Sequence, residues 1–77
     1  MSGMLSLQKP ARRCDLLSVE EAEEIIRYIA MTAESEDEVK EMLNRSGFDG
    51  DAADIIDAGE AGYHLSVWGP YDEVIRV

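Results

Sequence analysis

The sequence has one cysteine, Cys14, and one histidine, His64, among its 77 residues. A single cysteine cannot form a disulfide within the chain, so the fold does not depend on an oxidising compartment. One cysteine and one histidine also fall short of the three or four Cys/His ligands that a usual zinc site needs. We therefore predict no structural disulfide, no metal site and no cofactor.

Long apolar runs are missing as well. No segment approaches about 18 consecutive apolar residues, the minimum for a membrane-spanning helix. No apolar run follows a basic stretch near residue 1, as it would in a signal peptide. The chain is therefore expected to work in the cytoplasm, away from membranes.

Catalytic motifs are equally scarce, and neither of the glycine-rich phosphate-binding motifs is present. Cys14 follows Arg12 and Arg13, whose charges favour a thiolate, but a lone cysteine in a small protein more often packs in the core. His64 lies in an alternating segment, which favours a contact with a neighbouring strand or a partner. We predict that the protein is not an enzyme and has no catalytic residues.

Asp49, Asp51 and Asp54 raise the question of a calcium loop. An EF-hand needs its glycine at the sixth loop position and a glutamate at the twelfth, whereas Gly50 here occupies the second position. Helix capping accounts for the same aspartates. No calcium site is predicted.

What the chain has in excess is negative charge: 17 acidic residues against seven basic ones, a net charge of −10. The distribution is uneven, because residues 15–60 hold 15 acids and three bases, residues 1–14 hold three bases, and residues 61–77 are nearly neutral. Such a chain is repelled by nucleic acids and anionic membranes and attracts basic partners. With 45% hydrophobic residues, it is expected to fold as a single domain over residues 1–77.

Two capping patterns predict helices. Ser18 followed by Glu21 begins an apolar stripe with helical spacing, which predicts a helix over residues 19–33. Ser35 followed by Glu38 predicts a second helix over residues 36–46. Gly47 is expected to end the second helix in a left-handed cap, with Phe48 packing back on its last turn. These two helices also hold much of the acidic charge.

The remaining elements complete an α+β prediction. Asp49 or Asp51 is expected to cap a third short helix that turns Ile55 and Ile56 inward. Residues 63–68 alternate as a strand does, and the turn 69–72 leads to a second strand over 73–77, forming a hairpin. A short strand around Leu5 and Leu7 is expected to join it. The predicted order is β-α-α-α-β-β, with a small antiparallel sheet packed against three short helices.

The leading hypothesis for function uses the acidic surface. Carboxylates on short helices imitate the phosphate charge of a nucleic acid and fit the basic surface that normally binds one. In size and charge the chain is similar to the small acidic inhibitors that bacteriophages use against restriction or CRISPR complexes. The resemblance implies a partner protein with a basic surface, such as a nucleic-acid-binding complex, and no direct binding of nucleic acid. The carboxylates expected on this surface are Glu20, Glu24, Glu34, Asp37, Glu38, Glu41, Asp51, Asp54 and Asp57.

The alternative is an adaptor or regulatory module that binds a protein partner through an aromatic patch near the C-terminal hairpin. The candidates are Trp68, Tyr71, Tyr63 and Phe48, because tryptophan and tyrosine are enriched among residues that dominate binding energy, and Trp68 beside the turn 69–72 is favoured as the exposed anchor. In a variant of this hypothesis the last strand lies at the edge of the sheet and pairs with a second copy to form a homodimer.

Overall fold

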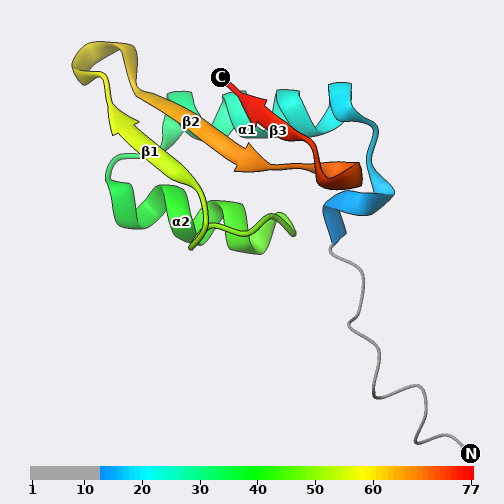
Figure 1. Ribbon diagram of the computed structural model, residues 1–77. Coiled ribbons are helices and arrows are strands. Elements are labelled where there is room, and N and C mark those ends of the chain that lie inside the picture. The colour runs from blue at the N-terminus through cyan, green and yellow to red at the C-terminus, as the bar shows by residue number, and fades with distance from the viewer. Residues whose placement is uncertain (1–12) are drawn as a thin grey trace, which may run out of the picture.

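The computed structural model describes residues 13–77, in which two helices lie on one face of a three-stranded antiparallel sheet (Figure 1). The α+β class is therefore confirmed, but the number and order of the elements differ from the prediction. The expected strand around Leu5 and Leu7 lies outside the described residues. The elements are the 3₁₀ turn η2 (Arg13–Leu16), helices α1 (Val19–Thr32) and α2 (Glu36–Arg45), strand β1 (Asp54–Asp57), turn η3 (Gly59–Ala61), strand β2 (Tyr63–Trp68), turn η4 (Pro70–Asp72) and strand β3 (Val74–Arg76).

Helix α1 begins where its capping pattern predicts. The Glu21 backbone N–H donates to Ser18 Oγ at 3.1 Å, and the Ser18 backbone N–H donates to Glu21 Oε1 at 2.9 Å. This reciprocal box satisfies two of the donors that a helix start leaves without partners. The inward face buries Ile26 and Ile29 together with two alanines, so the apolar stripe read from the sequence is the packing face.

Helix α2 is also confirmed, with a modified cap at its start. Ser35 Oγ accepts from the Glu38 backbone N–H at 3.1 Å, while the Glu38 carboxylate accepts from the Glu34 N–H instead of closing the box on Ser35. At the end, Gly47 has a φ of 91° and the Phe48 N–H donates to the Leu43 carbonyl at 2.9 Å. Phe48 is buried. This is the left-handed cap with a hydrophobic return that the sequence indicates.

The predicted third helix is wrong, because residues 54–57 form strand β1. Asp49 does accept a cap-like hydrogen bond from the Ala52 N–H at 3.2 Å, but it closes only a turn. Beyond that turn, Ile55 pairs with Leu65 and Ile56 pairs with His64. Two adjacent β-branched residues favour the extended conformation, and pairing with β2 satisfies their backbone groups. Ile55 faces the core, whereas Ile56 is 62% exposed and does not point inward as predicted.

The C-terminal hairpin is confirmed. Trp68 pairs with Val74 and Ser66 with Arg76, so β2 and β3 run antiparallel and β2 is the central strand. In the connection between β2 and β3, Tyr71 and Asp72 have φ values of 61° and 57°. These lie in the left-handed region, which is energetically unfavourable for L residues.

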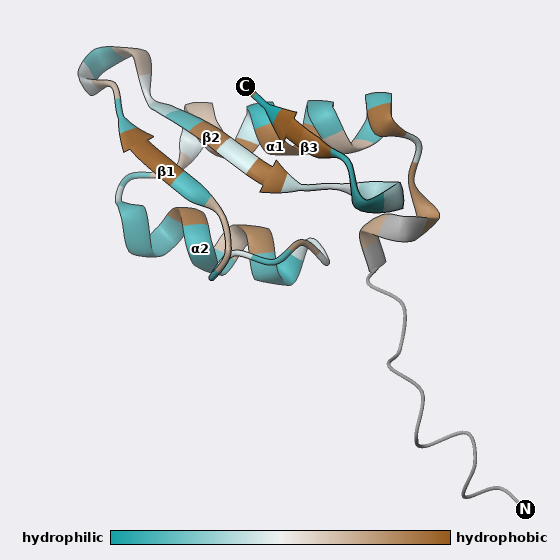
Figure 2. Cartoon of the chain, in the orientation of Figure 1, coloured by the Kyte–Doolittle hydropathy of each residue, from teal (hydrophilic) through white to brown (hydrophobic). Residues whose placement is uncertain are grey.

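The core lies between the helices and the inner face of the sheet. Figure 2 shows apolar residues on all three strands. The fully buried side chains include Ile26 and Ile29 from α1, Val39 and Leu43 from α2, and Leu65 and Val67 from β2. Cys14 is also fully buried. Because both helices pack on this one face, the opposite face of the sheet lacks a covering element among residues 13–77 (Figure 1).

Candidate functional site

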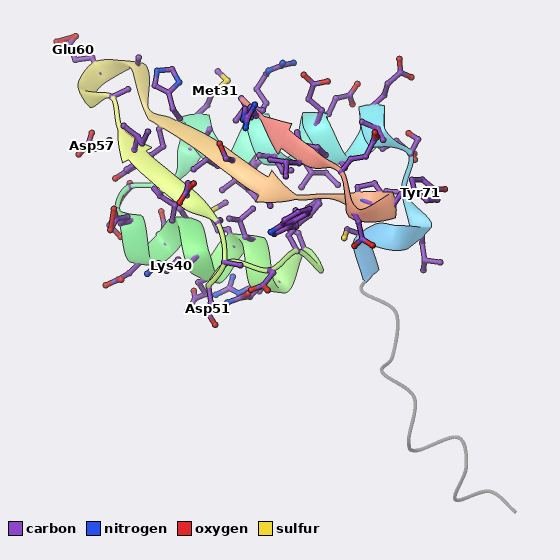
Figure 3. The ribbon with its side chains drawn as sticks, in the orientation of Figure 1. Met31, Lys40, Asp51, Asp57, Glu60 and Tyr71 are labelled. Carbon is purple, nitrogen blue, oxygen red and sulfur yellow. The ribbon has the colours of Figure 1, made fainter. Side chains whose placement is uncertain are left out.

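Acidic side chains gather where the start of α2 meets the hairpin between β1 and β2. The connection from α1 to α2 and this hairpin lie at the same end of the molecule (Figure 1). Figure 3 shows Asp57 and Glu60 there, pointing outward from the hairpin. We call this region the acidic end, and its carboxylates are those of Glu34, Glu36, Asp37, Glu38, Asp57 and Glu60.

The hairpin is held against the end of α1 by a close backbone approach at Gly62. A Cβ atom on this residue would lie 2.5 Å from the carbonyl oxygen of Ala30, and its φ is 90°. Only glycine fits both conditions without displacement of the backbone. The hairpin itself is tied by the Ala58 N–H, which donates to the Gly62 carbonyl at 2.9 Å, and by the Gly59 N–H, which donates to Asp57 Oδ1 at 2.8 Å. Asp57 is thereby placed near the start of α2, and Glu60 lies at the tip of the hairpin (Figure 3).

Tyr63 shows the electrostatic character of this end. Partial burial raises the pKa of its phenol above the ordinary 10.0, and the negative charges of Asp57, Glu36 and Glu38 raise it further. Carboxylates from β1 and from α2 therefore act on one side chain, although they are about 20 residues apart in sequence. Two acidic segments that are separate in the sequence form one negative region in the fold.

A groove runs from the acidic end along the space between α1 and α2. It has a volume of about 380 Å³ and combines two kinds of surface. Tyr28, which is 63% exposed, and Met42 supply apolar area, while carboxylates lie around them. The complete lining is Tyr28, Thr32, Glu34, Glu38, Glu41, Met42 and Arg45. Such a lining suits a segment that carries positive charge and an apolar side chain.

Few of the carboxylates are neutralised within the fold. Among the side chains that the structure describes, the ion pairs are Arg27 with Glu23 at 2.8 Å and Arg45 with Glu41 at 2.5 Å, each one helical turn apart. All four side chains are exposed to solvent, and such pairs stabilise a helix by only about 0.3–0.5 kcal/mol. Most of the described carboxylates of α1, α2 and β1 therefore lie outside these ion pairs.

The structure brings only some of the predicted acidic residues together. Asp37, Glu38 and Asp57 belong to the acidic end, and Glu41 and Glu34 line the adjoining groove. Glu20 and Glu24 lie at the other end of α1, since Glu20 precedes Thr32 by 12 residues, or roughly 18 Å of helix. Asp51 lies beside α2 near Lys40 (Figure 3). Sequence reasoning omitted Glu36, in the first turn of α2, and Glu60, in the hairpin. Both belong to the acidic end because the fold brings the hairpin and the start of α2 to the same end of the molecule.

Asp54 and Trp68 lie on the sheet surface opposite the helices, which we call the outer face. Because strand residues alternate sides, the outer face consists of Asp54, Ile56, His64, Ser66, Trp68, Val74 and Arg76. Trp68 is 42% exposed and Ile56 is 62% exposed. Tyr71 is also exposed, but it lies on η4, beside η2 and away from the strands of this face (Figure 3). Ile56 was missed as a surface residue because a helix was expected there.

Cys14 and His64 are on opposite sides of the sheet. Cys14 is buried in the core between helices and sheet, and His64 is exposed on the outer face. This arrangement does not provide the hydrogen-bonded nucleophile and base that covalent catalysis needs. Within residues 13–77, no group of three or more His, Cys, Asp or Glu side chains is arranged to hold a metal ion.

Neither α1 nor any other helix in the described part of the chain combines the length and apolar character that crossing a membrane requires. The chain matches no protein-family model, no curated protein and no solved structure.

Proposed function

We propose that this protein is a non-enzymatic inhibitor that covers a basic, nucleic-acid-binding surface of a partner protein with its acidic end and the adjoining groove. The observation that carries the proposal is the convergence of carboxylates from α2 and from the β1–β2 hairpin around Tyr63. A basic groove that binds nucleic acid attracts closely spaced negative charges, because duplex DNA presents about one charge per 1.7 Å of its axis. The acidic end offers a compact set of such charges.

The groove between α1 and α2 supports a protein partner rather than a free cation or small molecule. Carboxylates there flank Tyr28 and Met42, so an arginine or lysine side chain would meet negative charge at its head and apolar surface along its stem. An aromatic ring beside carboxylates also favours a guanidinium group through cation–π attraction. These features predict a partner rich in arginine and lysine.

A second candidate, an adaptor that binds through an aromatic patch, is favoured by the exposure of Trp68 on the outer face. Tyr71 contributes less to such a patch, because it projects from η4. In that case the acidic end would serve only to keep the protein dispersed, and charge changes there would leave partner binding intact.

The experiment is capture of partners from a lysate of the native host on the immobilised full chain, followed by elution with duplex DNA or with salt. We expect the retained proteins to be nucleic-acid-binding proteins that duplex DNA displaces, with affinity falling steeply as salt rises. The proposal would be wrong if the retained proteins are eluted neither by duplex DNA nor by about 0.5 M salt. It would also be wrong if no protein is retained.

Two matched variants locate the surface. Glu36→Gln with Asp37→Asn removes two charges from the first turn of α2, at the acidic end. Glu20→Gln with Glu24→Gln removes two exposed charges near the start of α1, at the other end. Both change the net charge from −10 to −8. We expect the first pair to weaken binding of the captured partner about tenfold and the second by less than about threefold. Equal effects would contradict the assignment to the acidic end.

A further inference from the structure

On the outer face, unlike the acidic end, acidic and basic side chains are equal in number. Asp54 is its one acid and Arg76 its one base, and the apolar side chains of Ile56, Trp68 and Val74 lie in the neighbouring rows of the sheet. Ile56, Trp68 and Val74 are 62%, 42% and 44% exposed. The face is therefore neutral and partly apolar, in a chain whose residues 15–60 carry a net charge of −12. The exposed apolar side chains give this face area that a protein partner could cover.

The strand register places the two charges symmetrically. Asp54 pairs with Ser66 across β1 and β2, and Ser66 pairs with Arg76 across β2 and β3. The three residues form one row across the sheet, with Ser66 in the middle. Since neighbouring strands are about 4.8 Å apart, Asp54 and Arg76 lie roughly 5 Å on either side of β2.

We propose that a second copy of this chain docks on the outer face, sheet against sheet, around a twofold axis that runs parallel to β2. Such an axis places β1 of each copy over β3 of the other. Asp54 of each copy then faces Arg76 of the other, and the two Trp68 side chains meet near the axis. A twofold interface needs a patch that is complementary to itself, and this row provides two identical ion pairs.

The charges also favour face-to-face docking of a second copy. They disfavour the two alternatives, which are edge-to-edge pairing of two copies and a basic partner at this face. A basic partner would find no excess of negative charge here. Pairing along the edge of β1 would bring Asp54 and Asp57 against the same residues of another copy, and the edge of β3 offers only three residues. In the face-to-face dimer the helices stay on the outside, so both acidic ends remain available. The inference uses different residues from the proposed function and does not depend on it.

The expected dimer is weak. The face is three strands wide and six residues long at β2, or about 14 Å by 20 Å, less than the roughly 800 Å² that each partner buries in a standard interface. The test is sedimentation equilibrium of the full chain from about 1 µM to 1 mM, with the emission of Trp68, the sole tryptophan, followed over the same range. We expect the mean mass to approach that of a dimer while the emission shifts to shorter wavelength. A monomer at all concentrations would overturn the proposal.

Charge exchange tests the geometry. Asp54→Lys alone and Arg76→Glu alone each place like charges opposite one another, so each should raise the dissociation constant of the dimer by about tenfold or more. The double variant, Asp54→Lys with Arg76→Glu, keeps the net charge at −10 and should return to within about threefold of the original value. An equimolar mixture of the two single variants should form a mixed dimer.

The outcomes separate this arrangement from others. If Asp54→Lys leaves the dimer intact, the copies meet elsewhere, for example along the edge of β3, and the proposal is wrong. Failure of the double variant to restore association, while its circular dichroism and thermal unfolding match the original protein, would also overturn it.

Discussion

The pKa of the Tyr63 phenol responds to the negative charge of the acidic end. Tyr63 is half-buried, and its desolvation together with the negative charges of Asp57, Glu36 and Glu38 raises its pKa above 10.0. The phenol is neutral when protonated, so both burial and nearby negative charge oppose its ionisation. The side chain is thus a built-in reporter of the local potential that the proposed function requires.

The raised pKa predicts how stability depends on pH. Below pH 10 the phenol is protonated in the folded and unfolded chain, and it adds no pH dependence. Above pH 10 the unfolded chain ionises first, so the free energy of unfolding falls until the pKa of folded Tyr63 is passed. Denaturant unfolding between about pH 9 and pH 11 should show a smaller fall in Tyr63→Phe than in the original protein.

The difference between the alkaline absorbance titrations of these two proteins isolates the midpoint of Tyr63. Glu36→Gln should lower that midpoint because it removes one of the three charges. A midpoint at or below 10.0 in the original protein would show that the carboxylates do not converge on this residue.

At the scale of elements, β1 decides how the other parts are arranged. It supplies the third strand of the sheet and places Asp57 beside the start of α2 and Asp54 on the outer face. A helix over the same residues would have turned both isoleucines toward the core and left β2 with one neighbour. The sequence pattern Ile55-Ile56 is compatible with either element, because two adjacent apolar residues define neither a helical nor an alternating period.

Matched substitutions test this element. Ile55→Thr and Ile56→Thr keep the branched Cβ atom and replace the ethyl group of isoleucine by a hydroxyl. We expect Ile55→Thr to lower the free energy of unfolding by about 1–2 kcal/mol, since Ile55 packs against the core. Ile56→Thr should change it by less than about 0.5 kcal/mol, since that side chain is exposed. Chemical denaturation followed by circular dichroism measures both, and equal losses would favour the helix that the sequence predicted.

At the scale of the whole molecule, the net charge of −10 opposes folding as well as directing binding. Compact packing brings like charges together, and salt screens their repulsion. Salt also weakens the two described ion pairs, but these exposed pairs contribute only about 0.3–0.5 kcal/mol each. Repulsion among many carboxylates is the larger effect.

The free energy of unfolding should therefore rise, on the order of 1 kcal/mol, when sodium chloride is raised from about 10 mM to 200 mM. The variant Glu20→Gln with Glu24→Gln should show a shallower rise because it carries two fewer charges. Stability that falls with salt would mean that attractive pairs dominate the surface. Partner binding is expected to respond in the opposite direction, so the two salt effects are separable.

The sequence by itself determined the local structure. The capping residues Ser18 and Ser35, the terminating Gly47 and the alternation of residues 63–68 each depend on neighbours within a few positions, and the corresponding helices and strand are present. Net charge and the scarcity of cysteine and histidine were likewise readable from the chain.

Only the tertiary structure decided the identity of β1 and the position of its carboxylates. Whether Ile55 and Ile56 extend depends on β2, which offers backbone partners from ten and eight residues away. The approach of Gly62 to Ala30 likewise joins segments about 30 residues apart, and it sets the hairpin that carries Asp57 and Glu60 against the end of α1. The periodicity of a segment depends only on residues near one another in the chain, so it does not predict contacts between distant segments. The sequence therefore showed the acidity, whereas the acidic end and the neutral outer face required the tertiary structure.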